Sequence, residues 1–232
     1  MPEMKIAVTG ATGFVGRKVA ETFSRKGLEV FAASRSFQKG QQGGMHQVRS
    51  PELAADSDWS AVTKDMDVVI HCAARVHIMN DGAADPLAEF RKVNRSGSVA
   101  LAHSAAEHGV KRFVFLSSIK VNGEQTGKDS PFDTRSIPQP CYPYGVAKLE
   151  AEQDLIALAQ ATGMELVIIR PVLVYGPGVQ ANFQRMIKAV DKNIPLPLGS
   201  VKNKRSMIYV ENLADLIYNT AEIGRASCRE RV

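Results

Sequence analysis

A glycine-rich turn near the start of the chain constrains the fold more than any other stretch. The run Ile6–Val8 is apolar, and three glycines follow at a spacing of three, at Gly10, Gly13 and Gly16. A helical pattern then extends over residues 14–26, so the order predicts a strand, a tight turn and a helix N-terminus. Glycine lets the backbone approach a phosphate, and a helix N-terminus offers unpaired N–H groups at its positive end.

We therefore predict that this turn cradles the pyrophosphate of a dinucleotide. The residues assigned to the cradle are Gly10, Thr12, Gly13, Phe14, Val15 and Gly16.

The rest of the chain alternates between expected strands and helices. Strands are expected at 29–33, 45–48, 67–74, 112–116, 166–170 and 207–210, and helices at 59–63, 86–108, 142–162, 182–192 and 211–220. This pattern predicts an α/β fold of the Rossmann type, a doubly wound parallel sheet that binds ligands beyond the carboxyl ends of its strands. We expect a dinucleotide-binding domain at 1–170 and a small, incomplete substrate lobe at 171–221, interleaved with the last sheet elements.

Composition and charge argue against several classes of function. Hydrophobic residues make up 44% of the 232 residues, enough for one sizeable core. The net charge is +5, but the basic residues are dispersed among 24 acidic ones, which argues against nucleic acid and suits an anionic small molecule. The three cysteines have no metal-ligand spacing, and no apolar run reaches the roughly 18 residues that span a bilayer. We expect a cytoplasmic protein without metal or membrane insertion.

The end of the second expected strand indicates which dinucleotide is bound. An acidic residue there would hold the 2′-hydroxyl of the adenosine ribose, whereas this chain has Ser34 and Arg35. A small hydroxyl beside a guanidinium suits a 2′-phosphate better, so NADP is favoured over NAD. The alternative is that Arg35 is a solvated loop residue.

Other small or polar residues follow the same logic. Ala73 and Ala74 end an apolar strand, where small side chains leave room for the cofactor. His71 fits a packed histidine better than a ligand or base, because no metal partner lies at a fixed offset. Within the expected helix 86–108, a glycine at Gly97 indicates close packing, and Asn94 is expected to bond a neighbouring strand or loop.

Tyr144 and Lys148 are four residues apart at the start of an expected helix, so they share one face. The alternative is an aromatic ring packed on a lysine stem. A phenol with a pKa of about 10 is a poor base, but a nearby ammonium favours the phenolate. Tyr144 can then move a proton at a sugar oxygen while hydride passes between the adjacent carbon and the cofactor. Ser118, at a strand end, would orient that oxygen, and Lys148 would also hold the nicotinamide ribose.

Several motifs occur together in a characteristic order. They are Gly10-x-x-Gly13-x-x-Gly16, Asp67-Val-Val-Ile-His71-Cys-Ala-Ala, Asn94-x-x-Gly97, Ser117-Ser118, Tyr144-x-x-x-Lys148 and Arg170-Pro-Val-Leu-Val-Tyr175-Gly176-Pro. As a set, over residues 4–221, they resemble the extended short-chain dehydrogenase/reductases of the NAD-dependent epimerase/dehydratase family, which act on nucleotide sugars. The runs 117–123 and 195–200 are similar to UDP-glucose 4-epimerase-like proteins, in particular to the 4-reductases of UDP-4-keto-6-deoxy-N-acetylhexosamines used in polysaccharide biosynthesis.

The resemblance implies further contacts. Pro171 would lie at the cofactor, Asn182 at the nucleotide diphosphate and Arg205 at the substrate pyrophosphate. Leu173 stands where many relatives have asparagine, so sugar recognition is expected to differ. The resemblance also implies a UDP-sugar substrate and a homodimer.

Three functions fit these motifs. The favoured one is an NAD(P)-dependent reductase that transfers hydride to C4 of a UDP-4-keto-hexosamine. The first alternative is a UDP-sugar 4-epimerase, which uses the same residues; Ser34 and Arg35 favour the reductase, because an epimerase usually keeps NAD bound. The second is an inactive NAD(P)-binding fragment or regulator, against which the presence of Ser118, Tyr144 and Lys148 argues.

The sequence changes character at its end. Residues 223–232 have no helical or strand period, and reverse translation gives a string that resembles a sequencing adapter. We therefore expect 222–232 to be a non-native tail on a chain cut short, with a natural basic tail as the alternative. A chain shortened in this way would expose apolar surface beside its sugar pocket.

Overall fold

A parallel sheet of six strands organises the chain. The computed structural model describes residues 4–36, 44–76, 84–127, 130–179, 181–195 and 199–222. The strand order is β3-β2-β1-β4-β5-β6, which is the doubly wound arrangement that the sequence predicts. The strands are β1 (Lys5–Thr9), β2 (Glu29–Ser34), β3 (His46–Arg49), β4 (Val68–His71), β5 (Arg112–Leu116) and β6 (Glu165–Ile169).

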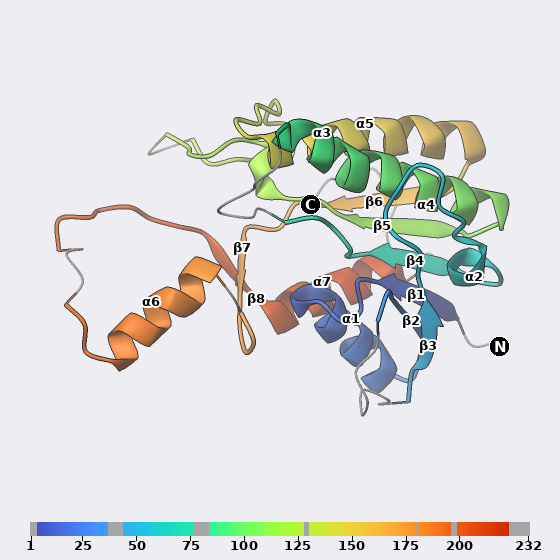
Figure 1. The fold of residues 1–232 in the computed structure, drawn as a ribbon, viewed down its shortest axis with the longest axis horizontal. Coiled ribbons are helices and arrows are strands. Elements are labelled where there is room, and N and C mark those ends of the chain that lie inside the picture. The colour runs from blue at the N-terminus through green and yellow to red at the C-terminus, as the bar shows by residue number, and fades with distance from the viewer. Residues whose placement is uncertain are drawn as a thin grey trace.

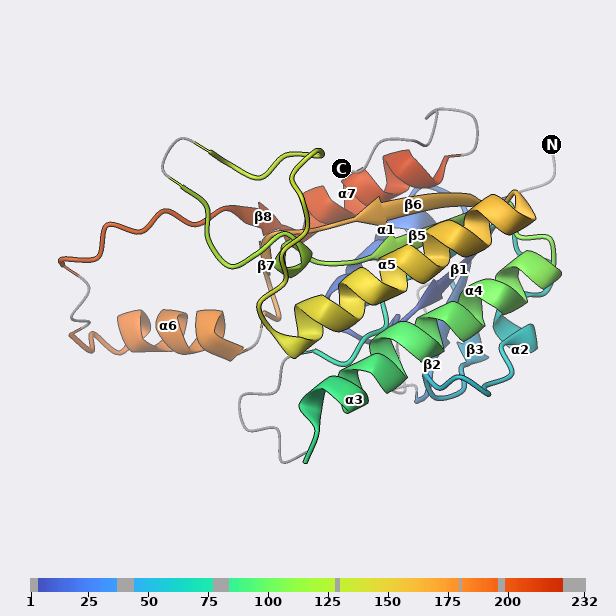
Figure 2. The same ribbon diagram turned by 90° about the horizontal axis from the view of Figure 1, so that it is seen from above.

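Helices cover both faces of this sheet (Figures 1 and 2). One face carries α1 (Phe14–Arg25) and α7 (Val210–Ala221), and the other carries α2 (Ser60–Thr63), α4 (Gly97–Glu107) and α5 (Pro143–Thr162). Alternation along β1 divides the core: Ile6 and Val8 pack with α1 and α7, while Ala7 packs with α4 and α5. Because all neighbouring strands of this sheet pair in parallel, their carboxyl ends lie at one edge of the sheet.

A second, two-stranded sheet lies beside the first. It pairs β7 (Leu173–Tyr175) with β8 (Met207–Tyr209) in parallel, and α6 (Ala181–Asp191) lies between them in sequence and stands away from the main sheet (Figure 1). The sequence predicted turns rather than a strand at 173–175, because three residues carry no period. α6 leaves Met186, Ile187 and Val190 exposed.

The expected helix 86–108 is continuous but changes its winding. It runs through α3 (Pro86–Phe90), the π-helical η1 (Arg91–Ser96) and α4. The Asp85 carboxylate caps its start by accepting a bond of 3.0 Å from the Ala88 N–H. The wider π-turn is a common device at functional sites, and here it carries the buried Asn94.

The domain boundary predicted near residue 170 stays a prediction. α7 follows the second sheet in the chain and packs against α1, which covers the main sheet. The predicted tail at 222–232 lies outside the described residues except for Glu222. No helix within the described ranges combines the length and the apolar character needed to cross a bilayer.

Gly97 allows close packing as predicted, and this contact can be tested. A Cβ at Gly97 would lie 2.6 Å from the Leu53 carbonyl carbon, which is main chain and cannot rotate away. Gly→Ala within a helix ordinarily stabilises by up to about 1 kcal/mol. Here we expect Gly97→Ala to lower the free energy of unfolding by about 2 kcal/mol because of overpacking, as measured by urea denaturation.

The control is Gly199→Ala, where an added Cβ meets nothing within 4 Å. It should change the free energy of unfolding by less than about 0.5 kcal/mol. Equal effects of the two substitutions would contradict the packing role of Gly97.

Candidate active site

The glycine turn joins β1 to α1 through contacts that leave no space for a side chain. Gly10 has a φ of 67°, and a Cβ there would lie 2.8 Å from the Ala73 nitrogen. A Cβ on Gly16 would lie 2.3 Å from the Gly10 oxygen. The N-cap residue Gly13 has no side chain to cap α1, so the first-turn N–H groups of Phe14 and its neighbours are left for a ligand. This arrangement suits an anion such as a pyrophosphate, and dinucleotide binding at the turn stays a prediction.

The end of β2 meets this turn through hydroxyl groups. The Ser34 hydroxyl donates to the Ser36 carbonyl at 2.9 Å, and it lies 2.9 Å from the Thr12 hydroxyl, from which it accepts. Arg35 follows with an exposed side chain. The structure therefore brings Thr12 and Ser34 together beside the expected adenosine site, with the guanidinium at the surface.

A buried chain of hydrogen bonds crosses the end of β4 through His71. The Ser98 hydroxyl donates to the Asn94 carbonyl at 2.8 Å and so accepts from His71 Nε2, 2.9 Å away. His71 Nδ1 then accepts from the Thr9 hydroxyl at 2.7 Å. His71 is thus a satisfied, neutral histidine, as predicted, and burial lowers its pKa to about 3.

Asn94 holds the loop after β4, as the sequence predicts. Its side-chain oxygen accepts from the Arg75 N–H at 2.8 Å, and its amide donates to the Arg75 carbonyl at 2.9 Å. The main chain at Ala73 and Ala74 is thereby held between this clamp and the glycine turn. Both alanines are partly buried, at the edge where the cofactor is expected.

Tyr144 and Lys148 extend from the first turns of α5. The Tyr144 ring packs edge-on against Phe90, with the two ring centres 5.8 Å apart. Lys148 is 1% exposed; its Nζ donates to the Leu116 carbonyl at 2.8 Å and lies 4.3 Å from the centre of the Phe115 ring. Ser118, partly buried two residues after β5, lies close enough to the Tyr144 side chain to affect its titration, and its hydroxyl accepts from the Lys120 N–H at 3.2 Å. The three predicted catalytic residues therefore meet at one sheet edge.

The titration of this set differs from the sequence-based expectation. Burial raises the pKa of the Tyr144 phenol to about 12, and hydrogen bonding with Ser118 acts in the opposite direction. Burial also lowers the pKa of Lys148 to about 8, against the attraction of the Glu152 carboxylate. The expectation that Lys148 lowers the pKa of the phenol was wrong for the protein alone, because loss of solvation dominates at both groups.

The remaining predicted contacts are the cofactor contact Pro171 and the substrate contacts Asn182 and Arg205. Pro171 is close to the predicted catalytic set, since its carbonyl accepts from the Ile119 N–H at 3.0 Å. Arg205 is exposed in the segment before β8, and the described part of the chain gives it no hydrogen bond or ion pair. Asn182 is the second residue of α6, and its side chain lies outside what the structure describes. These two contacts stay predictions.

Sequence reasoning missed one cluster beneath the site, the ion pair of Glu152 and Arg170. Glu152 follows Lys148 by four residues, on a helix face otherwise made of Ala147, Ala151 and Leu155. A carboxylate among apolar residues at that spacing was the available signal.

Among the described residues, no group of three or more acidic, histidine or cysteine side chains is arranged to bind a metal.

The His71 network predicts how stability depends on pH. The folded pKa is about 3 and the unfolded value about 6.5, so only the unfolded chain gains this proton between those values. The contribution of neutral His71 to the free energy of unfolding is complete above about pH 6.5. It falls by about 1.4 kcal/mol per pH unit as the pH drops below that value. We expect His71→Gln to remove this part of the slope between pH 6 and 4.5, measured by urea denaturation.

Replacing the exposed His103 by Gln is the matched control and should leave the slope as in the wild type. A His71→Gln slope equal to that of the wild type would contradict a neutral, buried imidazole.

Comparisons with known proteins agree with this geometry. The model of the NAD dependent epimerase/dehydratase family matches residues 6–227. A protein of Vibrio cholerae described as UDP-glucose 4-epimerase is 45% identical over 229 residues, which are 98% of this chain and 69% of that protein.

Solved structures share the fold. MoeE5 in complex with UDP-glucose and NAD is 26% identical with a TM-score of 0.76, covering 95% of this chain and 72% of that one. UDP-glucuronic acid 4-epimerase from Bacillus cereus, in complex with UDP-glucuronic acid and NAD, has a TM-score of 0.81 at 24% identity, covering 95% and 74%. With the glycine turn and the Ser118, Tyr144 and Lys148 set in place, the chain belongs to the NAD-dependent epimerase/dehydratase family of enzymes.

Proposed function

We propose that this enzyme is a UDP-sugar 4-epimerase. The observation that carries the proposal is the meeting of Ser118, Tyr144 and Lys148 at the sheet edge that also holds the glycine turn. Such a set acts on a sugar hydroxyl and its carbon. The 45% identity to a protein described as UDP-glucose 4-epimerase favours epimerisation over the reductase that the sequence motifs favoured.

The chain's own residues would handle the proton and the orientation of the sugar. The dinucleotide, when bound, supplies a hydride acceptor and then a hydride donor. Tyr144 takes the proton from the sugar O4 and later returns it, and Ser118 holds that oxygen in line. Because burial raises the pKa of the phenol to about 12, Tyr144 needs added positive charge to act as a base, and a cationic ring nearby would provide it.

Asn182 and Arg205 are proposed to hold the substrate diphosphate, in line with the UDP-sugars bound by the neighbouring structures. Rotation of the keto sugar between two faces requires that this diphosphate stays fixed while the hexose turns. Homodimerisation stays a prediction.

The proposal predicts interconversion of UDP-glucose and UDP-galactose, followed by nucleotide-sugar chromatography with NAD or NADP present. Tyr144→Phe should lower kcat by about 10²- to 10⁴-fold, because it removes the proton carrier, and should leave the dissociation constant of the dinucleotide within about twofold. Tyr142→Phe, at the exposed position just before α5, is the matched control and should retain turnover.

Retained turnover in Tyr144→Phe would refute its acid–base role. Oxidation of NADPH by a UDP-4-keto-6-deoxy-hexosamine, without interconversion of any 4-epimer pair, would replace the epimerase by the reductase.

We further propose that NADP is accepted at least as well as NAD, through Arg35. The described end of β2 offers a hydroxyl already bonded to Thr12 and a guanidinium at the surface, and no carboxylate to repel a 2′-phosphate. The family description and the neighbouring structures name NAD, so the preference has to be measured for this chain.

Arg35→Ala should weaken NADP about tenfold, from loss of one charge-assisted contact, and leave NAD unchanged in a calorimetric titration. Arg135→Ala, at a side chain 91% exposed in a different loop, should change neither affinity. Tight NAD binding with no effect of Arg35→Ala on either dinucleotide would contradict the preference.

A further inference from the structure

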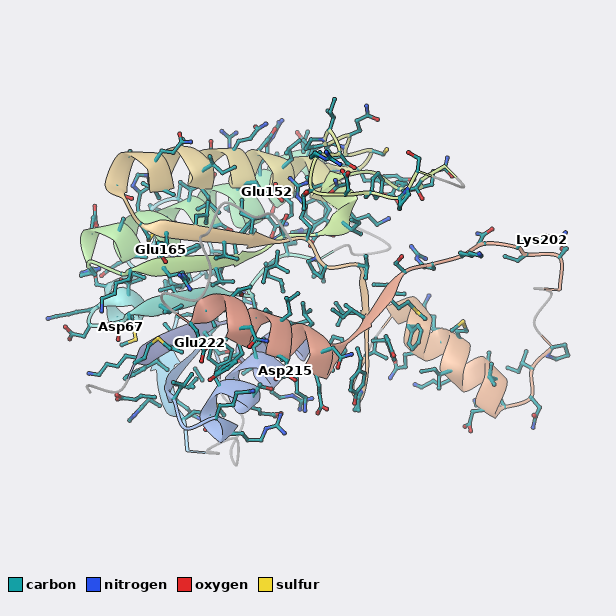
Figure 3. All side chains as sticks on the ribbon, turned by 180° about the vertical axis from the view of Figure 1, so that it is seen from behind. Asp67, Glu152, Glu165, Lys202, Asp215 and Glu222 are labelled. Atoms are coloured by element: carbon teal, nitrogen blue, oxygen red, sulfur yellow. The ribbon has the colours of Figure 1, made fainter. Side chains whose placement is uncertain are left out.

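We propose that Glu152 and Arg170 are positioning residues. They fix the positions of Ser118, Tyr144 and Lys148 relative to one another. The proposal rests on the proposed function, since it concerns the same site. Both side chains are buried, so their proposed role is to act through the residues of the site. Figure 3 shows Glu152 between α5 and the strand layer, beneath the helix that carries Tyr144 and Lys148.

The two side chains form a buried, two-pronged ion pair. Arg170 Nε lies 2.9 Å from Glu152 Oε1, and Arg170 Nη2 lies 2.5 Å from Oε2. The Glu152 side chain is 2% exposed and that of Arg170 9%. Two parallel bonds fix the angle between the groups as well as their distance.

Two further bonds extend the pair to the neighbouring elements. The Ser117 hydroxyl donates to Glu152 Oε1 at 2.5 Å, and Arg170 Nη1 donates to the Asn122 side-chain oxygen at 3.1 Å. Both oxygens of the Glu152 carboxylate thus accept hydrogen bonds from residues outside α5. The result is one cluster that joins α5 to the ends of β5 and β6.

Three of the four members of the cluster lie close in sequence to residues of the site. Ser117 precedes Ser118, and Arg170 precedes Pro171. Glu152 is one helical turn after Lys148 and two turns after Tyr144. A shift of α5 relative to β5 would therefore break the cluster as it moved Tyr144 relative to Ser118.

Stability alone does not account for a buried ion pair. Removing both charges from water is costly, and apolar side chains of similar volume often stabilise a protein equally well or better. What the pair supplies in addition is a fixed orientation, which a reaction at one sugar oxygen requires.

The Glu152 carboxylate also acts electrostatically on the Lys148 ammonium, which lies one helical turn before it on α5. The titratable groups near Lys148 come from two elements: the uncharged Cys72 thiol and the neutral His71 from the end of β4, and the charged Glu152 from α5. Glu152 favours the protonated lysine, against the effect of burial. Without the carboxylate, Lys148 should lose its proton at lower pH, and the Arg170 charge left behind should act in the same direction.

The first test needs no turnover and uses the whole chain. Glu152→Gln keeps the size of the side chain and removes its charge. Nζ of Lys148 would be followed by ¹⁵N NMR in lysine-labelled protein, with its signal identified by its loss in Lys148→Arg. We expect the midpoint of the Lys148 titration to fall by about one pH unit in Glu152→Gln.

The control is Asp67→Asn, which removes the carboxylate paired with Lys111 at the far end of the sheet (Figure 3). It should leave the Lys148 midpoint unchanged. An unchanged midpoint in Glu152→Gln would overturn the proposed link to Lys148, whether or not the protein turns over any UDP-sugar.

The second test is kinetic. Glu152→Gln should lower kcat more than it changes KM and move the alkaline limb of the pH profile to lower pH. Ser117→Ala, which removes one bond and no charge, keeps the test open if Glu152→Gln does not fold. It should lower kcat about tenfold with KM within about twofold and leave the Lys148 midpoint in place.

Equal kcat in Ser117→Ala and wild type, or a loss of activity in Glu152→Gln that is the same at every pH, would overturn the positioning role. Failure of the wild type to act on any UDP-sugar would count against the proposed function. The NMR titration would still decide whether Glu152 acts on Lys148.

Discussion

Backbone contact at the glycine turn is the constraint on which the rest of the structure depends. Gly16 lies against the Gly10 oxygen, and Gly10 lies against the main chain at Ala73, so that α1, β1 and the end of β4 meet with no side chain between them. This contact fixes the position of α1 relative to the carboxyl ends of β1 and β4. It leaves the uncapped N-terminus of α1 at the place where a pyrophosphate can bind.

From that edge, buried polar groups connect the strand ends in turn. The His71 network links β1 and β4 to α4, and Asn94 carries the link to the loop at Arg75. The Glu152 and Arg170 pair does the same for β5, β6 and α5. Each network is satisfied by neighbours from distant parts of the sequence, which is the condition under which buried polar groups specify one arrangement.

Local patterns carried much of the prediction. The turn, the parallel sheet, the close packing at Gly97 and the packed state of His71 are encoded in residue type and spacing, and the structure confirms them. The pairing of β7 with β8 was missed, because three residues have no period and their partner lies far along the chain. The direction of the Tyr144 pKa shift was also missed, since burial is a property of the fold and cannot be seen in a four-residue spacing.

The site itself was predicted as a set of residues and not as a reaction. Ser118, Tyr144 and Lys148 serve a reductase and an epimerase equally, so motif spacing could not separate them. What differs is the fate of the hydride, which an epimerase returns to the carbon it came from and a reductase delivers to a new substrate.

The most direct measurement therefore follows that hydride. UDP-glucose carrying deuterium at C4 would be incubated with the protein in ordinary water, and the UDP-galactose formed would be analysed by mass spectrometry and NMR. The account predicts that deuterium is retained at C4 of the product. Protium at C4, or no product unless NADPH is consumed, would contradict it.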